Sequence, residues 1–155
     1  LMNKHEIFRN IYEVYSESLL DVFDTINFVD SEKNYDDFCK NNIENEKRRS
    51  QCVFMINLVK EEVSDKNIIV SALDTIIEKF KDWSTNKEKK NHIEELTELM
   101  YIVVVNSNEL FNEHEKWGEM INTIKDFSER ELSDDFPGLS NKVLFKCMDI
   151  IDEIE

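Results

Sequence analysis

Apolar residues recur at intervals of three and four along nearly the whole chain, and very few residues interrupt this pattern. The 155 residues include only two glycines and one proline. Apolar spacing of this kind is typical of helices that each bury one face, and so few turn-forming residues disfavour a sheet with tight hairpins. The sequence therefore predicts an all-α protein.

The periodicity predicts six helices. Their approximate spans are Lys4 to Asn27, Glu46 to Glu62, a segment after Ser64 that ends at Phe80, a segment that carries Ile93 to Val103, Trp117 to Phe127, and Leu139 to Ile154. The asparagine-rich stretch from Asp30 to Asn45 has few apolar residues, and we expect a loop with one helical turn there. The run Tyr101 to Val105 suits a strand by composition, but its upstream sequence has helical period, which favours a helix.

Two helix starts carry recognisable capping residues. The side chain of Ser64 is expected to cap the helix that follows it. Thr85 and Glu88 have the spacing of a capping box, in which each side chain accepts a hydrogen bond from the backbone of the other residue. These caps predict new helices after Ser64 and after Thr85.

Short connections between successive helices predict antiparallel hairpins. We expect one hairpin over Glu46 to Phe80 and another over Lys87 to Glu131. Their starts lie about 40 residues apart, which is the spacing of two-helix solenoid repeats. The preferred architecture is a single domain over residues 1–155, a HEAT-like superhelix of stacked hairpins, and the alternative is a closed bundle of four or five helices.

The charge balance limits the class of partner. Against 19 lysines and arginines stand 34 aspartates and glutamates, and the formal net charge is −15. Such a chain repels phosphate backbones on average, so a basic protein partner is favoured over nucleic acid. No apolar run approaches the length of a membrane span, and we expect a soluble protein in the cytosol or nucleus.

The residue types that carry catalysis are sparse, and we expect no enzyme, no cofactor and no metal. Two glycines cannot form a glycine-rich phosphate loop. His92 and Glu95 share a helix face, which is more often a surface pair than a metal site. The cysteines lie within apolar patterns or beside aromatic residues, and we interpret them as buried and unreactive; they are Cys39, Cys52 and Cys147.

Basic and aromatic residues offer weaker signals. Two basic clusters, Lys47 to Arg49 and Lys87 to Lys90, are more simply explained as solvated side chains than as phosphate contacts. Tryptophan is common at binding hot spots. Trp117 falls in an apolar stripe and is expected in the core, whereas Trp83 lies in a polar connection, where core and interface are both open.

From about Glu46 onward the chain resembles the middle domain of eukaryotic translation initiation factor 4G. The resemblance begins at Arg48-Arg49-Ser50 and the helix from Phe54 to Lys60. It continues through His92 to Val104, Trp117 to Phe127 and the Ser140 to Asp152 segment, which is similar to the terminal helix signature of the family. The resemblance implies a stack of HEAT-type hairpins, of which this chain would hold the later repeats.

The resemblance also implies a function. Members of the family are scaffolds without catalytic activity that hold a DEAD-box RNA helicase of the initiation factor 4A type in a half-open state. We therefore expect a cytoplasmic translation-initiation scaffold, with this helicase and other initiation proteins as partners. The residues expected to contact the partner flank the apolar stripe of the last helix and the turn before it; they are Asp134, Asp135, Lys142, Lys146, Asp149 and Asp152.

Two other functions remain open from the sequence. The same helical family occurs in scaffolds of mRNA decay, splicing, cap binding and poly(A)-protein binding, so a different protein partner is the first alternative. A direct RNA-binding helical module, which would use the two basic clusters, is the second. The second alternative predicts an affinity that falls steeply with added salt.

Overall fold

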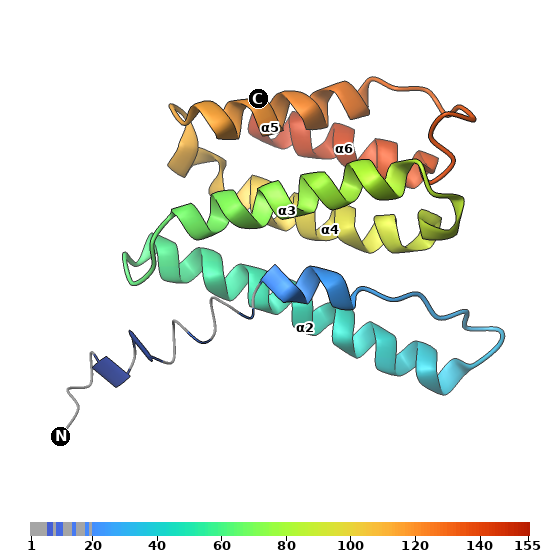
Figure 1. Ribbon diagram of the computed structural model, residues 1–155, viewed down its shortest axis with the longest axis horizontal. Helices are drawn as coiled ribbons and strands as arrows, with labels where there is room; N and C mark the ends of the chain where they lie inside the picture. Colours follow the sequence, from blue (N-terminus) through green and yellow to red (C-terminus); the bar gives the residue numbers. More distant parts are fainter. Residues whose placement is uncertain (1–5, 8, 11–13, 15–17, 19) are drawn as a thin grey trace.

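The computed structural model describes residues 6, 7, 9, 10, 14, 18 and 20–155, and all regular structure in this part of the chain is helical (Figure 1). The all-α prediction is confirmed. The elements are the 3₁₀ helix η1 (Val22–Thr25), α2 (Tyr35–Lys60), α3 (Asn67–Ser84), η2 (Lys87–Lys89), α4 (Lys90–Ser107), η3 (Asn108–Phe111), α5 (Glu115–Ser128) and α6 (Asn141–Ile154). Part of the predicted helix from Lys4 to Asn27 lies outside the described residues; those described before η1, residues 6, 7, 9, 10, 14, 18, 20 and 21, are helical, and the segment ends in η1.

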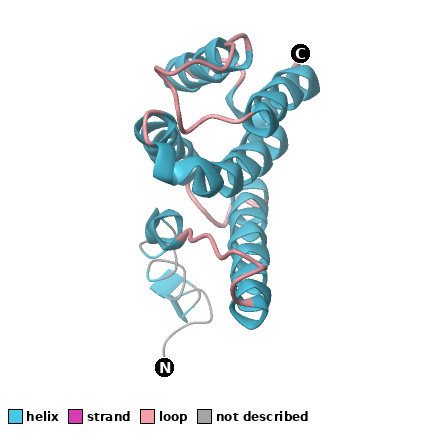
Figure 2. Cartoon of the chain, turned by 90° about the vertical axis from the view of Figure 1, so that its right-hand side faces the viewer, coloured by secondary structure: helices cyan, strands magenta, loops and turns pink. Residues whose placement is uncertain are grey.

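The helices stack in tiers. α3 packs along α4, and α5 packs along α6, so these two pairs form the middle and upper tiers of Figure 1, above η1 and α2. α4 also packs against α2 on one side and α6 on the other, while α3 packs against α5. The result is one row made of α2, α4 and α6 and a second row made of α3 and α5, as the end-on view in Figure 2 also shows.

This pairing differs from the predicted hairpins. The predicted partners were the helices within Glu46 to Phe80 and within Lys87 to Glu131, but neither α2 with α3 nor α4 with α5 packs closely; α4 packs against α2, α3 and α6, and α5 packs mainly against α6. The connection between α5 and α6, residues 129–140, is longer than the one between α2 and α3, residues 61–66. The apolar faces of α3 and α4 meet each other in the core.

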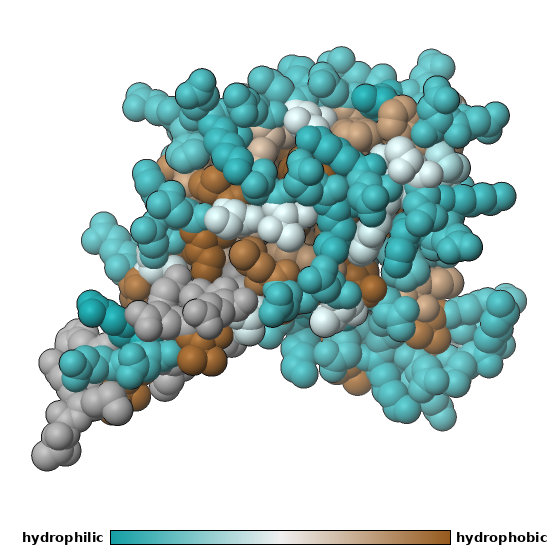
Figure 3. All heavy atoms as spheres, in the orientation of Figure 1, coloured by the Kyte–Doolittle hydropathy of each residue, from teal (hydrophilic) through white to brown (hydrophobic). Residues whose placement is uncertain are grey.

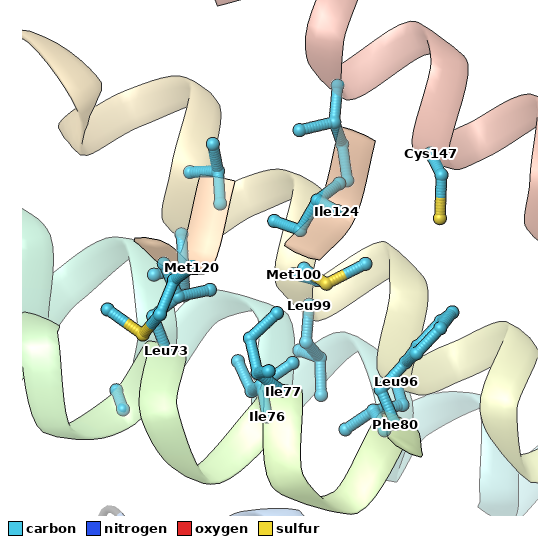
Figure 4. Packing of buried hydrophobic residues seen from close by; sticks show 14 of the residues in the cluster. Leu73, Ile76, Ile77, Phe80, Leu96, Leu99, Met100, Met120, Ile124 and Cys147 are labelled. Carbon is cyan, nitrogen blue, oxygen red and sulfur yellow. The ribbon is translucent and has the colours of Figure 1, made fainter. Parts of the chain in front are cut away.

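One continuous core joins the two rows. Leu73, Ile77 and Phe80 of α3 face Leu96 and Met100 of α4, and side chains of α5 and α6 close over them (Figure 4). All of these residues are almost fully buried. The run Tyr101 to Val105 belongs to α4, so its predicted helical conformation is confirmed.

Helix α2 is longer than the sequence predicted. It begins at Tyr35, so most of the stretch from Asp30 to Asn45 is helical rather than a loop. The side chain of Asn34 accepts a hydrogen bond from the amide of Asp37 at 3.0 Å and donates one to its carboxylate at 2.7 Å. This reciprocal cap lets a helix begin where there is little apolar surface to bury.

The predicted caps of the next two helices are replaced by neighbouring residues. Asp65 rather than Ser64 accepts a hydrogen bond at the start of α3, from the amide of Asn67 at 2.8 Å. Asn86 rather than Thr85 accepts from the amide of Glu88 at 3.0 Å. The hydroxyl of Thr85 instead donates to the carbonyl oxygen of Asp82 near the end of α3, because Thr85 is the C-terminal cap of that helix rather than the N-terminal cap of the next.

The connection between α5 and α6 closes the end of the middle tier. The amide of Gly138 donates to the carbonyl oxygen of Ser84 at 2.8 Å, at the end of α3. A β-carbon at position 138 would lie 2.0 Å from the carbonyl oxygen of Trp83. Only glycine allows this close approach, which places Ser140 as the N-terminal cap of α6, where its hydroxyl accepts from the amide of Val143.

Candidate interaction surface

The six residues predicted to contact a partner do not form one cluster. Asp134 and Asp135 are exposed in the connection before α6, and the other four lie along α6. Lys142 and Asp152 are ten residues apart on this helix, which corresponds to roughly 15 Å. The structure therefore divides the predicted site into an acidic loop, two lysines and two aspartates.

The two lysines are tied to the neighbouring helix α4. The Nζ of Lys142 lies 2.9 Å from a carboxylate oxygen of Glu94, and the Nζ of Lys146 lies 3.3 Å from one of Glu98. Lys146 also lies over the ring of Tyr101, 4.8 Å from its centroid. These lysines link α6 to α4, so a partner would have to compete with the carboxylates for them.

The aspartates of α6 are available to a partner. Asp149 and Asp152 are exposed, and neither has a hydrogen-bond or ion-pair partner among the described residues. Two large apolar side chains on the same helix, Phe145 and Met148, are also exposed, with 60% and 38% of their surface accessible. The outer side of α6 therefore combines carboxylates with apolar surface.

The first basic cluster is structural, and its interpretation as solvated side chains is wrong for two of its three members. Arg49 reaches from α2 to Glu95 of α4, where two nitrogens lie 3.0 and 2.5 Å from the two carboxylate oxygens. These hydrogen bonds raise the pKa of Arg49. Glu95 is buried, with 8% of its side chain exposed, and Arg49 is 33% exposed, so this two-point ion pair joins α2 to α4 at a partly buried interface.

Arg48 holds the segment that precedes α2. Its guanidinium donates to the carbonyl and hydroxyl oxygens of Thr25, at the end of η1, and to the side chain of Asn45. Burial lowers the pKa of Arg48. The sequence contained a signal for this role, because Arg48 lies at helical spacing from the buried residues Cys52 and Met55.

A pocket of about 350 Å³ lies beside the Arg49–Glu95 ion pair. We call it the α2–α4 pocket. Its walls come from the segment before α2, from the first halves of α2 and α4, and from the start of α6. Its lining residues are Asn27, Phe28, Val29, Phe38, Asn41, Asn42, Asn45, Arg49, Asn91, Glu94, Glu95, Glu98 and Lys142. The sequence contains no signal for this pocket, because the pocket depends on how α2 packs against α4.

Trp83 and Trp117 are both buried, so the structure settles the open interpretation of Trp83 in favour of the core. Lys79 and Lys89 lie over the ring of Trp83, at 5.2 and 5.3 Å from its centroid. Trp117 stacks on Phe111 with 4.5 Å between ring centroids. These residues stabilise the tiers rather than offer anchors to a partner.

The remaining candidates for chemistry have structural surroundings. Glu95 binds Arg49 rather than forming the predicted surface pair with His92. His92 is partly buried, and burial together with the charge of Lys89 lowers its pKa. Burial raises the pKa of Cys52 and of Cys147 to about 12 in each case, so both thiols stay protonated at neutral pH.

Among the residues that the structure describes, no group of histidines, cysteines and carboxylates could hold a metal ion. None of their helices is long and apolar enough to cross a bilayer. On the face seen in Figure 3, hydrophilic residues dominate, and the apolar ones form separate patches.

No protein-family model, no curated protein and no solved structure matches this chain.

Proposed function

We propose that the chain is a non-catalytic translation-initiation scaffold of the HEAT-like superhelical kind, which binds a DEAD-box RNA helicase of the initiation factor 4A type in the cytoplasm. The observation that carries this proposal is the stacking of helices in tiers, with α2, α4 and α6 side by side in one row. Stacked helical pairs present long surfaces suited to protein partners.

The segments that carry the resemblance to the initiation factor 4G middle domain support the proposal. They fall on observed helices: the second half of α2, then α4, α5 and α6. The segment Ser140 to Asp152 begins at the residue that caps α6. Each of these similar segments therefore lies on a helix, as the resemblance implies.

The proposed mechanism is a shift in the conformational equilibrium of the helicase. A scaffold that binds the half-open arrangement of the two helicase lobes more tightly than the open one raises the population of the half-open state. The size of the shift equals the difference between the two binding free energies. No group on the scaffold has to react, because the ATP chemistry belongs to the helicase.

The available groups on α6 define the contact. Asp149 and Asp152 are exposed carboxylates that can pair with basic residues of a helicase lobe, and Asp134 and Asp135 form a separate acidic surface in the connection before α6. Lys142 and Lys146 are held by Glu94 and Glu98 and serve mainly to fix α6 in place. The aspartates are thus the better part of the predicted site to test.

The proposal is tested by titrating an initiation factor 4A-type helicase with the chain and measuring affinity and ATPase rate. Asp149→Lys with Asp152→Lys should weaken binding by about fivefold or more, because both changes reverse charges at the contact. The matched control is Asp82→Lys with Asp126→Lys, which reverses two exposed charges on α3 and α5. Equal effects of the two double variants, or no stimulation of the ATPase by the unaltered chain, would contradict the proposal.

The structure gives less support to RNA as the main ligand. Arg48 and Arg49 are engaged in hydrogen bonds within the chain. The remaining basic cluster is Lys87, Lys89 and Lys90, of which Lys89 lies against Trp83. A salt series of RNA binding therefore should give a shallow slope.

A further inference from the structure

The segment before α2 is an extended chain that already contacts the α2–α4 pocket. Ile26, which follows η1, has an extended backbone with φ −63° and ψ 125°. The next residue, Asn27, offers its carbonyl oxygen to the side-chain amide of Asn41 on α2, at 3.2 Å. One asparagine of α2 thus already binds the main chain of a segment that lies along the helix.

More asparagines line the same pocket. The side-chain amide of asparagine both donates and accepts, so it can bind a peptide group of any sequence. Asn42 on α2 and Asn91 on α4 line the α2–α4 pocket and are exposed. Within the described part of the chain, neither side chain has a hydrogen-bond partner. The pocket therefore holds two unused amides on neighbouring helices.

Apolar surface lies beside these amides. Phe28 lines the pocket with 46% of its surface exposed, and Phe38 lines it as a partly buried side chain. Two rings at one wall can take an apolar side chain of a bound segment. The pocket therefore combines side-chain amides that can hydrogen-bond the main chain of a ligand with apolar surface that can contact its side chains. These are the two components of extended-peptide recognition.

The charge of the chain as a whole favours a basic ligand. Glu94, Glu95 and Glu98 outnumber Arg49 and Lys142 among its lining residues. Both cations are paired with Glu95 and Glu94, and Glu98 is paired with Lys146, so these ion pairs leave neither a free cation to attract an anion nor a free carboxylate. The net charge of −15 adds a long-range attraction for positive charge.

We propose that the α2–α4 pocket binds an extended, basic peptide segment of a partner protein. Asn42 and Asn91 hydrogen-bond its main chain, and Phe28 and Phe38 contact one of its apolar side chains. This site is separate from the aspartates of α6 and goes beyond helicase binding. It adds a second class of ligand, a linear motif, to the scaffold.

The test begins with a phage-displayed library of random 12-residue peptides selected on the full chain. Peptides that combine lysine or arginine with apolar residues should be enriched. Each enriched peptide is then made with a fluorescent label, and its affinity is measured by anisotropy. Absence of enriched peptides, or enrichment of acidic ones, would overturn the proposal.

Asn42→Ala with Asn91→Ala separates main-chain recognition from simple charge attraction, because the change leaves the net charge unaltered. We expect the Kd of the enriched peptides to rise at least fivefold. The matched control is Asn112→Ala with Asn122→Ala, which removes two exposed asparagines outside the pocket and should leave the Kd unchanged. Equal affinities of the two double variants would overturn the proposal.

A second measurement examines the peptide itself. Methylation of alternate backbone nitrogens removes hydrogen-bond donors and keeps every side chain and charge. Binding should fall at least fivefold for one of the two possible methylation patterns. If neither pattern changes the Kd, the main chain is not recognised and the proposal fails. A helicase titration in parallel shows whether the α6 contact stands or falls independently.

Discussion

Gly138 is the residue at which the smallest change should have the largest effect. An added β-carbon would lie 2.0 Å from the carbonyl oxygen of Trp83 and 2.9 Å from that of Asn86. Both atoms belong to the backbone, so the connection before α6 must move away and lose the hydrogen bond to Ser84. We expect Gly138→Ala to lower the free energy of unfolding by about 1–3 kcal/mol, measured by urea denaturation.

The control for this variant is the other glycine of the chain. Gly118 lies inside α5, and a β-carbon there would have no atom within 4 Å. Gly118→Ala should raise the free energy of unfolding by about 0.5–1 kcal/mol, because alanine loses less backbone entropy in a helix. If both variants were destabilised alike, the packing explanation for Gly138 would be wrong.

The two buried thiols predict how stability depends on pH. Burial raises the pKa of Cys52 and Cys147 from the ordinary value of 9.0 to about 12. Below pH 9 both folded and unfolded chains hold these protons. Above it the unfolded chain loses them first, so each thiol lowers the free energy of unfolding by up to about 1.4 kcal/mol per pH unit until pH 12.

Urea denaturation between pH 8 and 10.5 measures this slope. Cys52→Ala with Cys147→Ala should flatten it, although the variant starts from a lower stability because it leaves cavities. An unchanged slope in the double variant would exclude the thiols as its cause.

The sequence predicted the burial of a single residue well where the apolar pattern around that residue determines it. The burial of Cys52 and Cys147 followed from their place in apolar patterns, whereas Cys39, also predicted to be buried, is only partly buried. The prediction that Arg48 and Arg49 are solvated was wrong. A guanidinium group stays in water unless the fold places a hydrogen-bond acceptor beside it. The partners of the two arginines, Thr25 and Glu95, lie 23 and 46 residues away in the chain, and no local pattern brings them together.

At the scale of the element, the first half of α2 shows what apolar periodicity overlooks. Tyr35 and Ile43 are exposed, so this part of the helix buries little and leaves a weak periodic signal. Its stability comes from the Asn34 cap and from ion pairs one turn apart, such as Lys40 with Asp37. The cap residue and the acidic first turn were the available signal.

Removal of the cap should therefore affect the start of α2 and little else. We expect Asn34→Ala to cost about 1 kcal/mol and to accelerate hydrogen exchange at the amides of the first two turns, measured by NMR. Asn34→Ser is the control, because the serine hydroxyl also accepts a hydrogen bond from the Asp37 amide and places no second carboxylate beside that of Asp37. A uniform acceleration across all helices would contradict a local role for Asn34.

At the scale of the whole molecule, α4 is the central element. It packs against α2, α3 and α6, whereas the first half of α2 is largely exposed. Local opening of a protein follows such differences in burial. Native-state hydrogen exchange should show the slowest amides in α4, near the limit set by global unfolding, and the fastest helical amides near the start of α2. Equal exchange in both helices would contradict this order.

The tiered arrangement also marks the limit of sequence analysis. The helices themselves followed from apolar spacing, but the choice of partner for each helix did not, since every helix has an apolar face that fits several neighbours. The α2–α4 pocket exists only because α2 lies beside α4. The sequence alone gave no indication that its asparagines line a pocket, and those between Asp30 and Asn45 were predicted to lie in a loop.

The unequal accessibility of the three thiols should allow selective chemical labelling of one of them. Cys52 and Cys147 are enclosed and hold their protons at neutral pH, but Cys39 is partly accessible and adjoins Phe38 at the pocket wall. A maleimide dye added under mild conditions should thus attach at one position without any engineering of the chain. A fluorophore on Cys39 would then lie close to the α2–α4 pocket, and its emission should change when a peptide binds there.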